Sequence, residues 1–144
     1  MSVQIGPNST LDIIYINITL TNNGWRPVNM LLPKDLHGFE TGPFDIIVLD
    51  ANNNRISDMR NELNLSQASE IRELKSNHFR EFYIQLFNIE TKPWFNDIGL
   101  RNVPIINNTN STGPYSIYVI YDTTDYEGDV WKGTLESEIY YLPD

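Results

Sequence analysis

The C-terminal segment, residues 113–142, constrains the fold more than any other part of the chain, because its apolar and polar side chains alternate. Two alternating runs flank an acidic stretch at residues 122–129. In the second run one face collects Trp131, Gly133, Leu135, Ser137, Ile139 and Tyr141, and the other face collects Lys132, Thr134, Glu136 and Glu138. Successive side chains of a strand point to opposite faces, so this period of two predicts a β-hairpin with one dry face and one solvated face.

Shorter runs of the same kind predict further strands at residues 11–21, 28–32, 44–50 and 79–89. The run at 44–50 is apolar on both faces, which favours a central strand. Residues 57–74 are polar and ambiguous, with one helical turn predicted near residues 66–72. About seven short strands separated by Gly, Pro and Asn turns favour an all-β fold, an antiparallel β-sandwich, with a closed barrel as the alternative.

The composition indicates one folded domain spanning residues 1–144. With 40% hydrophobic and 12% aromatic residues, the chain has enough apolar side chains for a core. The net charge of −9 argues against nucleic acid and anionic membranes as partners, because both require clustered Lys and Arg. The absence of cysteine excludes disulfides, thiolate zinc sites and cysteine nucleophiles.

The compartment and the oligomeric state stay open at this point. The first residues lack a basic segment followed by an apolar one, so we expect no signal peptide, and no run is long enough to insert into a membrane. An extracellular or envelope location is slightly favoured if a signal peptide has been removed, and a cytoplasmic one otherwise. The exposed edges of a sandwich would suit a dimer.

Three segments resemble bacterial immunoglobulin-like domains. They are Leu-Thr-Asn-Asn-Gly-Trp-Arg-Pro-Val at residues 20–28, Phe-Asp-Ile-Ile-Val-Leu-Asp at 44–50, and the closing hairpin. Related sandwiches include the intracellular proteinase inhibitor of bacilli and the N-terminal domain of some deuterolysin-type metallopeptidases. The resemblance implies an immunoglobulin-like sandwich with Greek-key connections, and a peptidase inhibitor or prodomain as one alternative function. Two features depart from the pattern: Leu-Lys-Ser-Asn replaces the usual Leu-x-Pro-Gly turn at residues 74–77, and the connection at 91–112 is long.

The acidic stretch in the hairpin is the candidate metal site. Asp122, Asp125, Glu127 and Asp129 supply the oxygen ligands that calcium prefers, although their spacing differs from that of an EF-hand loop. The competing interpretation is a solvated hairpin tip that discourages edge pairing. Between the two, the solvated tip is the expectation.

The tryptophans divide between core and loops. Trp131 is expected in the core, and Trp25 is expected to fold back and cap one end of the sandwich. Trp94 and Phe95, in the long connection, are the candidate partner-binding residues, since loop aromatics can anchor a protein or stack on a sugar.

No motif supports catalysis. His37 and His78 lie in separate predicted loops, and neither a His-Glu-x-x-His nor a Gly-x-Ser-x-Gly motif accompanies them. We therefore expect a non-enzymatic module without a cofactor that binds a protein partner through residues 91–112 and 122–129. A calcium- or carbohydrate-binding module is the further alternative.

Overall fold

In the computed structural model, residues 1–9, 14–33, 42–55, 69–86 and 114–141 are described, and within these ranges the chain contains strands and turns but no helix. The strands are β1 (Ser2–Ser9), β2 (Ile14–Thr21), β3 (Val28–Pro33), β4 (Phe44–Leu49), β5 (Ser69–Leu74), β6 (Phe79–Leu86), β7 (Ser116–Asp122), β8 (Thr134–Glu136) and β9 (Tyr140–Tyr141). The all-β prediction is confirmed. No helix of the described ranges is long and apolar enough to cross a membrane.

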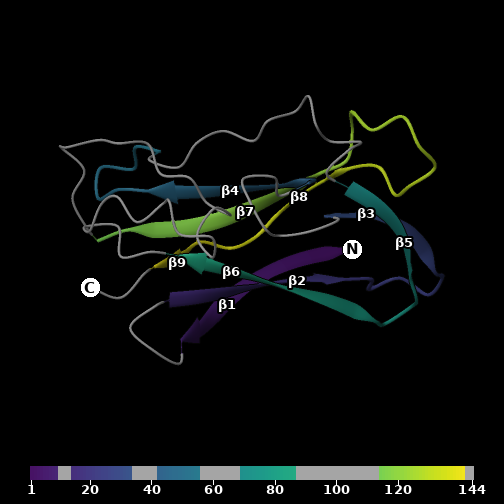
Figure 1. Cartoon of the computed structure of the whole chain (residues 1–144), viewed down its shortest axis with the longest axis horizontal. Helices are drawn as coiled ribbons and strands as arrows, with labels where there is room; N and C mark the ends of the chain where they lie inside the picture. The colour runs from purple at the N-terminus through teal and green to yellow at the C-terminus, as the bar shows by residue number, and fades with distance from the viewer. Residues whose placement is uncertain (10–13, 34–41, 56–68, 87–113, 142–144) are drawn as a thin grey trace.

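The strands form three antiparallel sheets (Figure 1). One sheet has the order β1-β2-β6, the second pairs β3 with β5, and the third has the order β4-β7-β8, with β9 also paired to β7. In the first sheet Ile18 of β2 lies between Ile5 of β1 and Phe82 of β6. The expected strand at 44–50 forms β4, which pairs with β7 among the described strands, and its central position stays a prediction.

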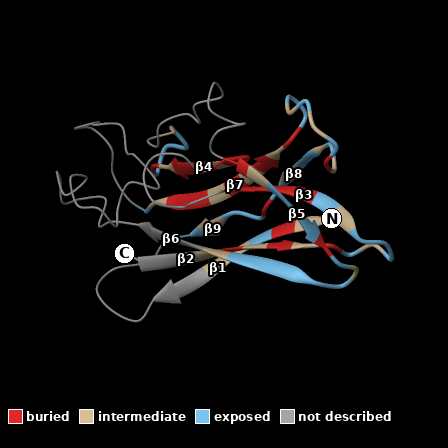
Figure 2. Ribbon diagram, turned by 45° about the vertical axis from the view of Figure 1, so that its right-hand side comes forward, coloured by how far each residue is buried: buried red, intermediate tan, exposed pale blue. Residues whose placement is uncertain are grey.

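All three sheets contribute to one apolar core. Its fully or nearly fully buried members are Val3, Ile18, Leu20, Met30, Leu32, Phe44, Ile46, Val48, Leu74, Ile117, Val119 and Tyr121. Figure 2 shows buried residues concentrated along β4 and β7. Phe44 and Tyr121 pack with their rings tilted and the ring centroids 5.2 Å apart. The Tyr121 hydroxyl donates a 2.8 Å hydrogen bond to the Leu31 carbonyl, and burial raises the pKa of this phenol.

Two strands were missed or misread in the sequence. The helical turn expected near residues 66–72 is wrong where it is described, since Ser69–Leu74 is the strand β5. The sequence of β5 shows no clear alternation of apolar and polar residues, because Glu70 and Arg72 lie at the surface on the edge of the sheet. The strand β1 was not predicted, since Gly6 and Pro7 interrupt it. Pro7 is tolerated because β1 pairs with β2 alone among the described strands, which leaves one edge without ladder bonds.

The predicted closing hairpin forms, but a bulge divides its second run. Glu136 pairs with Ile120, and Tyr140 pairs with Ile117. Between these two pairs the second run advances by four residues while β7 advances by three, so the second run contains one extra residue. One extra residue moves the following side chains to the opposite face. Tyr140 therefore packs against the core, while Ile139 and Tyr141, expected on the dry face, are 49% and 71% exposed.

The Ser137 hydroxyl stabilises this bulge. The Ser137 N–H donates to the Val119 carbonyl at 2.9 Å, but the buried Val119 N–H donates to the Ser137 hydroxyl oxygen, also at 2.9 Å. A side chain thus replaces the backbone carbonyl that a regular ladder would offer, and the buried Val119 N–H keeps an acceptor.

Candidate functional site

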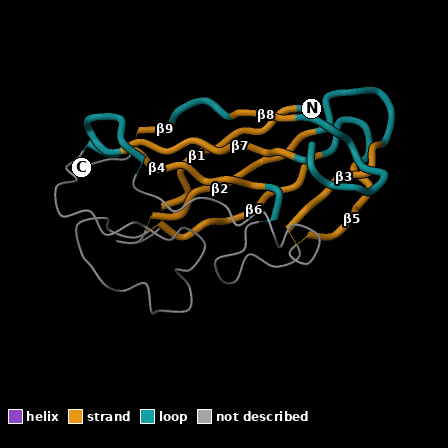
Figure 3. The backbone as a smooth tube through the Cα atoms, turned by 90° about the horizontal axis from the view of Figure 1, so that it is seen from above, coloured by secondary structure: helices purple, strands orange, loops and turns teal. Residues whose placement is uncertain are grey.

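Three turns lie together at one end of the molecule, on the right in Figure 1. They are the β2–β3 turn at residues 22–27, the β5–β6 turn at 75–78 and the β7–β8 loop at 123–133. Figure 3 shows loop segments gathered at the end where β3 and β5 lie. Because loops on a fixed sheet scaffold commonly carry binding residues, this end is the candidate functional site.

Asn22 joins two of these turns. Its side chain is 2% exposed and donates hydrogen bonds to the carbonyls of Arg26 (2.8 Å) and Leu74 (3.0 Å). Its side-chain oxygen accepts the Gly24 N–H at 3.0 Å, and its backbone N–H donates to the His78 carbonyl at 3.0 Å. These bonds fix the β2–β3 turn against the β5–β6 turn.

The β5–β6 turn completes the contact between the two turns. Asn77 has a left-handed φ of 59°, a conformation that Asn adopts more readily than most residues, and its N–H donates to the Asn22 carbonyl at 2.9 Å. The Ser76 hydroxyl donates to the Gly24 carbonyl at 2.5 Å. Residues 74–77 thus form a tight turn without proline or glycine, with Asn77 in a left-handed conformation that glycine also adopts.

Trp25 projects from the turn that Asn22 holds. Its side chain is 89% exposed, and the Arg26 guanidinium carbon lies 6.0 Å from its ring centroid. The expectation that Trp25 folds back to cap the end of the molecule is therefore wrong. The turn is held away from the core, because Asn22 and Gly24 on either side of Asn23 are hydrogen-bonded to the Leu74 carbonyl and the Ser76 hydroxyl. A large rigid aromatic is thus presented to solvent on a fixed backbone.

The β7–β8 loop is also held in place from within. Thr123 is fully buried, and its hydroxyl donates to the Trp131 carbonyl at 2.6 Å and accepts the Gly133 N–H at 3.1 Å. Tyr126 packs on the small cluster of Leu31 and Val130, and the Trp131 N–H donates to the Asn29 carbonyl at 2.8 Å. The loop is therefore docked on β3.

Trp131 packs against the main core, as expected. Its ring centroid lies 6.0 Å from that of Tyr121, and its side chain is partly buried. The ring also explains the glycine that follows two residues later, since a Cβ on Gly133 would lie 2.6 Å from its Cη2 atom.

The four acidic residues at 122–129 do not form a group that could hold a metal ion. Asp122 caps the turn: one of its carboxylate oxygens accepts the Thr124 N–H at 2.9 Å and the Thr124 hydroxyl at 2.7 Å. Asp125, Glu127 and Asp129 are exposed. Within the described ranges no three His, Asp or Glu side chains are grouped so that they could hold a metal ion. The calcium site remains a prediction, and the turn-capping bonds give Asp122 a structural role.

A groove of about 370 Å³ opens between the docked loop and the edge of β3. It is lined by Pro27, Val28, Asn29, Glu73, Asp129, Val130 and Trp131. Pro27 belongs to the turn that carries Trp25, so the groove connects the three-turn end with the face of the β3–β5 sheet.

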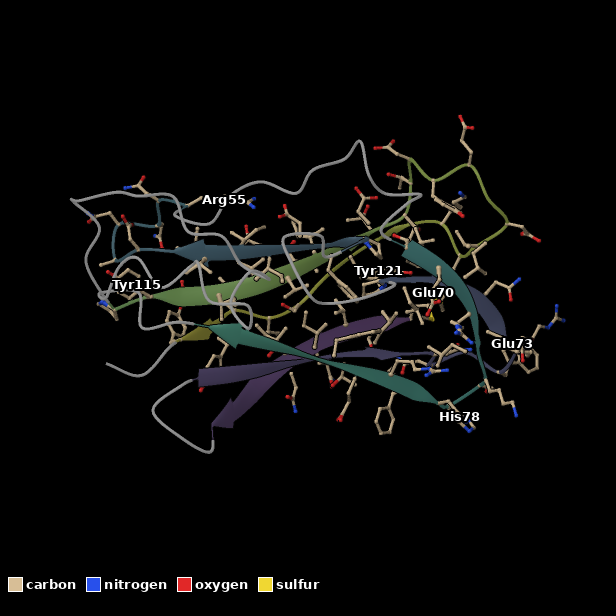
Figure 4. The ribbon with its side chains drawn as sticks, in the orientation of Figure 1. Arg55, Glu70, Glu73, His78, Tyr115 and Tyr121 are labelled. Atoms are coloured by element: carbon tan, nitrogen blue, oxygen red, sulfur yellow. The ribbon has the colours of Figure 1, made fainter. Side chains whose placement is uncertain are left out.

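Of the remaining candidate residues, some lie outside the described ranges and one lies within them. Trp94, Phe95, His37 and the connection at 91–112 lie outside them. His78 is exposed in the β5–β6 turn, where its Nδ1 atom lies 2.9 Å from the Ser76 carbonyl oxygen (Figure 4). The exposure of Trp25 was missed, since burial depends on how the turn is anchored; the available clue in the sequence was Asn22 before an Asn-Gly pair, which is typical of a tight turn.

No family model matches the chain, and the search of curated proteins found no relative. The immunoglobulin-like resemblance of residues 20–28, 44–50 and 113–142 therefore remains a prediction from the sequence.

Proposed function

We propose that this protein is a non-catalytic binding module that docks a protein partner on its three-turn end. The module would be one immunoglobulin-like domain with Greek-key connections. Its support is the order of the chain: β1 and β2 lie in the first sheet, β3 to β5 leave it, β6 returns to it, and β7 to β9 complete the third sheet. Loops gathered at the ends of the sheets are typical of such a fold, and the turns after β2, β5 and β7 share one end (Figure 1).

The exposed side chain of Trp25 is the observation that carries the proposal. An indole buries 150–250 Å² when covered, and at about 25 cal/mol per Å² such burial is worth roughly 4–6 kcal/mol before association costs. Tryptophan is also among the residues most enriched at interface hot spots. With 89% of this side chain exposed, the chain leaves nearly all of that energy available to a partner.

Preorganisation strengthens the argument. The hydrogen bonds of Asn22 and Ser76 fix the backbone that carries Trp25, so little backbone entropy is lost when a partner binds. Arg26, beside the ring, offers a charge that can pair with an acidic group at the rim. A fixed aromatic with a neighbouring cation is a typical protein-docking element.

A photo-crosslinking amino acid at position 25 tests the proposal. The matched control places it at Tyr141, which is 71% exposed on β9 at the opposite end of β7 from the loop. We expect a specific protein adduct from position 25 and none from position 141. Equal labelling from both positions, or adducts with glycans alone, would refute a protein-docking role for this end.

A peptidase inhibitor is the more specific form of the proposal. Fixed loops favour it, because inhibitory loops must already have their bound conformation. Serine and metallopeptidases are assayed with increasing amounts of the protein, alongside a Trp25→Ala variant. Inhibition that weakens in the variant supports this form; full peptidase activity at a large molar excess eliminates it and leaves other protein partners.

A further inference from the structure

The strand β5 has an edge without a partner among the described strands. It pairs with β3 along one side, and no strand within the described ranges pairs with its other side. The middle of the strand is accessible: Ile71 is 44% exposed, and the side chains of Arg72 and Glu70 are 58% and 36% exposed. Figure 4 shows Glu70 and Glu73 along this strand at the right of the molecule.

The sequence of this edge complements itself. A second copy related by a twofold axis perpendicular to the sheet would extend the ladder antiparallel, and each side chain would keep its face. Such an axis must lie between the two strands, midway between the two copies of one residue. At Glu70 it would set two carboxylates opposite each other, and at Arg72 two guanidinium groups. At Ile71 it sets each Glu70 opposite the Arg72 of the other copy.

The Ile71 register also places two apolar side chains together at the axis. The two charged pairs would lie with Cβ atoms about 5 Å apart, the distance at which cross-strand pairs of opposite charge stabilise a sheet. Within one chain the Arg72 Nε atom already lies 3.3 Å from the Glu70 carboxylate. In the dimer the four groups would form a ring of alternating charge.

We infer that two copies of this chain associate through antiparallel pairing of β5 with β5, centred on Ile71. The interaction is separate from the three-turn end, and neither proposal depends on the other. Pairing of β5 with β5 would give hydrogen-bond partners to the backbone N–H and C=O groups along this edge. Without them, the edge could pair with strands of unrelated chains.

Charge reversal tests the inference, with sedimentation equilibrium as the measurement. The wild type dimerises, and Arg72→Glu and Glu70→Arg each weaken self-association by roughly tenfold or more, because every opposed pair becomes repulsive. An equimolar mixture of the two single variants forms a 1:1 heterodimer. The double variant Glu70→Arg/Arg72→Glu regains the wild-type dimer. Both residues are on the surface, so circular dichroism should show unchanged folding.

Three outcomes would overturn the inference. One is a wild type that stays monomeric at millimolar concentration. This would mean that the charged side chains prevent pairing at the β5 edge or that another strand covers it. The second is a single variant that dimerises as the wild type does. The third is a mixture of the two folded variants that stays monomeric.

Discussion

The Asn22→Ala substitution removes the side chain that fixes the Trp25 turn. Three hydrogen bonds are lost: those donated to the carbonyls of Arg26 and Leu74, and the one accepted from the Gly24 N–H. Each contributes about 0.5–1.5 kcal/mol net, and the bond to the Leu74 carbonyl is buried, so that carbonyl is left with little access to water. We expect a loss of roughly 2–4 kcal/mol in the free energy of unfolding.

Asn23→Ala is the matched control. Asn23 is the exposed neighbour, and its side chain makes one hydrogen bond, to the Ser2 hydroxyl at 3.0 Å. Its loss should cost about 0.5 kcal/mol or less, as at most surface sites. Urea unfolding of both variants, with equal slopes, gives the comparison. If Asn22→Ala costs less than about 1 kcal/mol, or no more than the control, the reasoning about this buried amide is wrong.

The Asn22→Asp variant adds a test of sign. The new carboxylate would be buried and would face the carbonyl oxygens of Arg26 and Leu74. Burial and the two carbonyl dipoles disfavour the charged form, so the pKa of this carboxyl would be raised in the folded state. A group whose pKa is raised in the folded state contributes stability at pH values below its unfolded pKa, and this contribution is lost as the pH rises. The deficit of this variant against the wild type should therefore shrink between pH 7 and pH 4. A deficit that grows on acidification would contradict the described environment.

Three further perturbations follow from the structure. Ser137→Ala leaves the buried Val119 N–H without an acceptor and should cost about 1–3 kcal/mol in urea unfolding, whereas no loss would mean that the bulge closes by itself. Tyr121→Phe should cost about 1 kcal/mol at pH 7, because the bond to the Leu31 carbonyl is lost. Burial raises the pKa of Tyr121, so its stabilisation is present below about pH 10 and falls above it; the deficit of the Phe variant should narrow by pH 11, and a constant deficit would refute this. The melting temperature should be the same in calcium and in EDTA, since the acidic side chains do not converge; a clear rise with calcium would establish the metal site.

The sequence predicted strands where a run alternates clearly or is apolar on both faces. The runs that became β2, β4, β6 and β7 were found in the sequence because one or both of their faces are apolar. The strand β5 escaped because Glu70, Arg72 and Glu73 interrupt its apolar positions at a surface edge. Local sequence does not reveal whether a charged run is a turn or an edge strand, since the β3 partner decides it.

The register of the closing hairpin and the exposure of Trp25 could not be predicted from the sequence for the same reason. The bulge at Ser137 depends on which residue of β7 lies opposite, so Ile139 and Tyr141 were assigned to the wrong face. The exposure of Trp25 depends on bonds between turns that are 52 residues apart in the chain. Both features are long-range, and both bear on the candidate site or its scaffold.

The most direct test of the docking claim is the affinity for the partner identified by cross-linking at position 25. Calorimetry would compare the wild type with Trp25→Ala and with Tyr141→Ala, which removes an exposed aromatic elsewhere. The account predicts a dissociation constant roughly 30-fold or more weaker for Trp25→Ala, the effect of a hot spot worth about 2 kcal/mol. It predicts a change of less than about twofold for Tyr141→Ala. Equal affinities for all three proteins would contradict it.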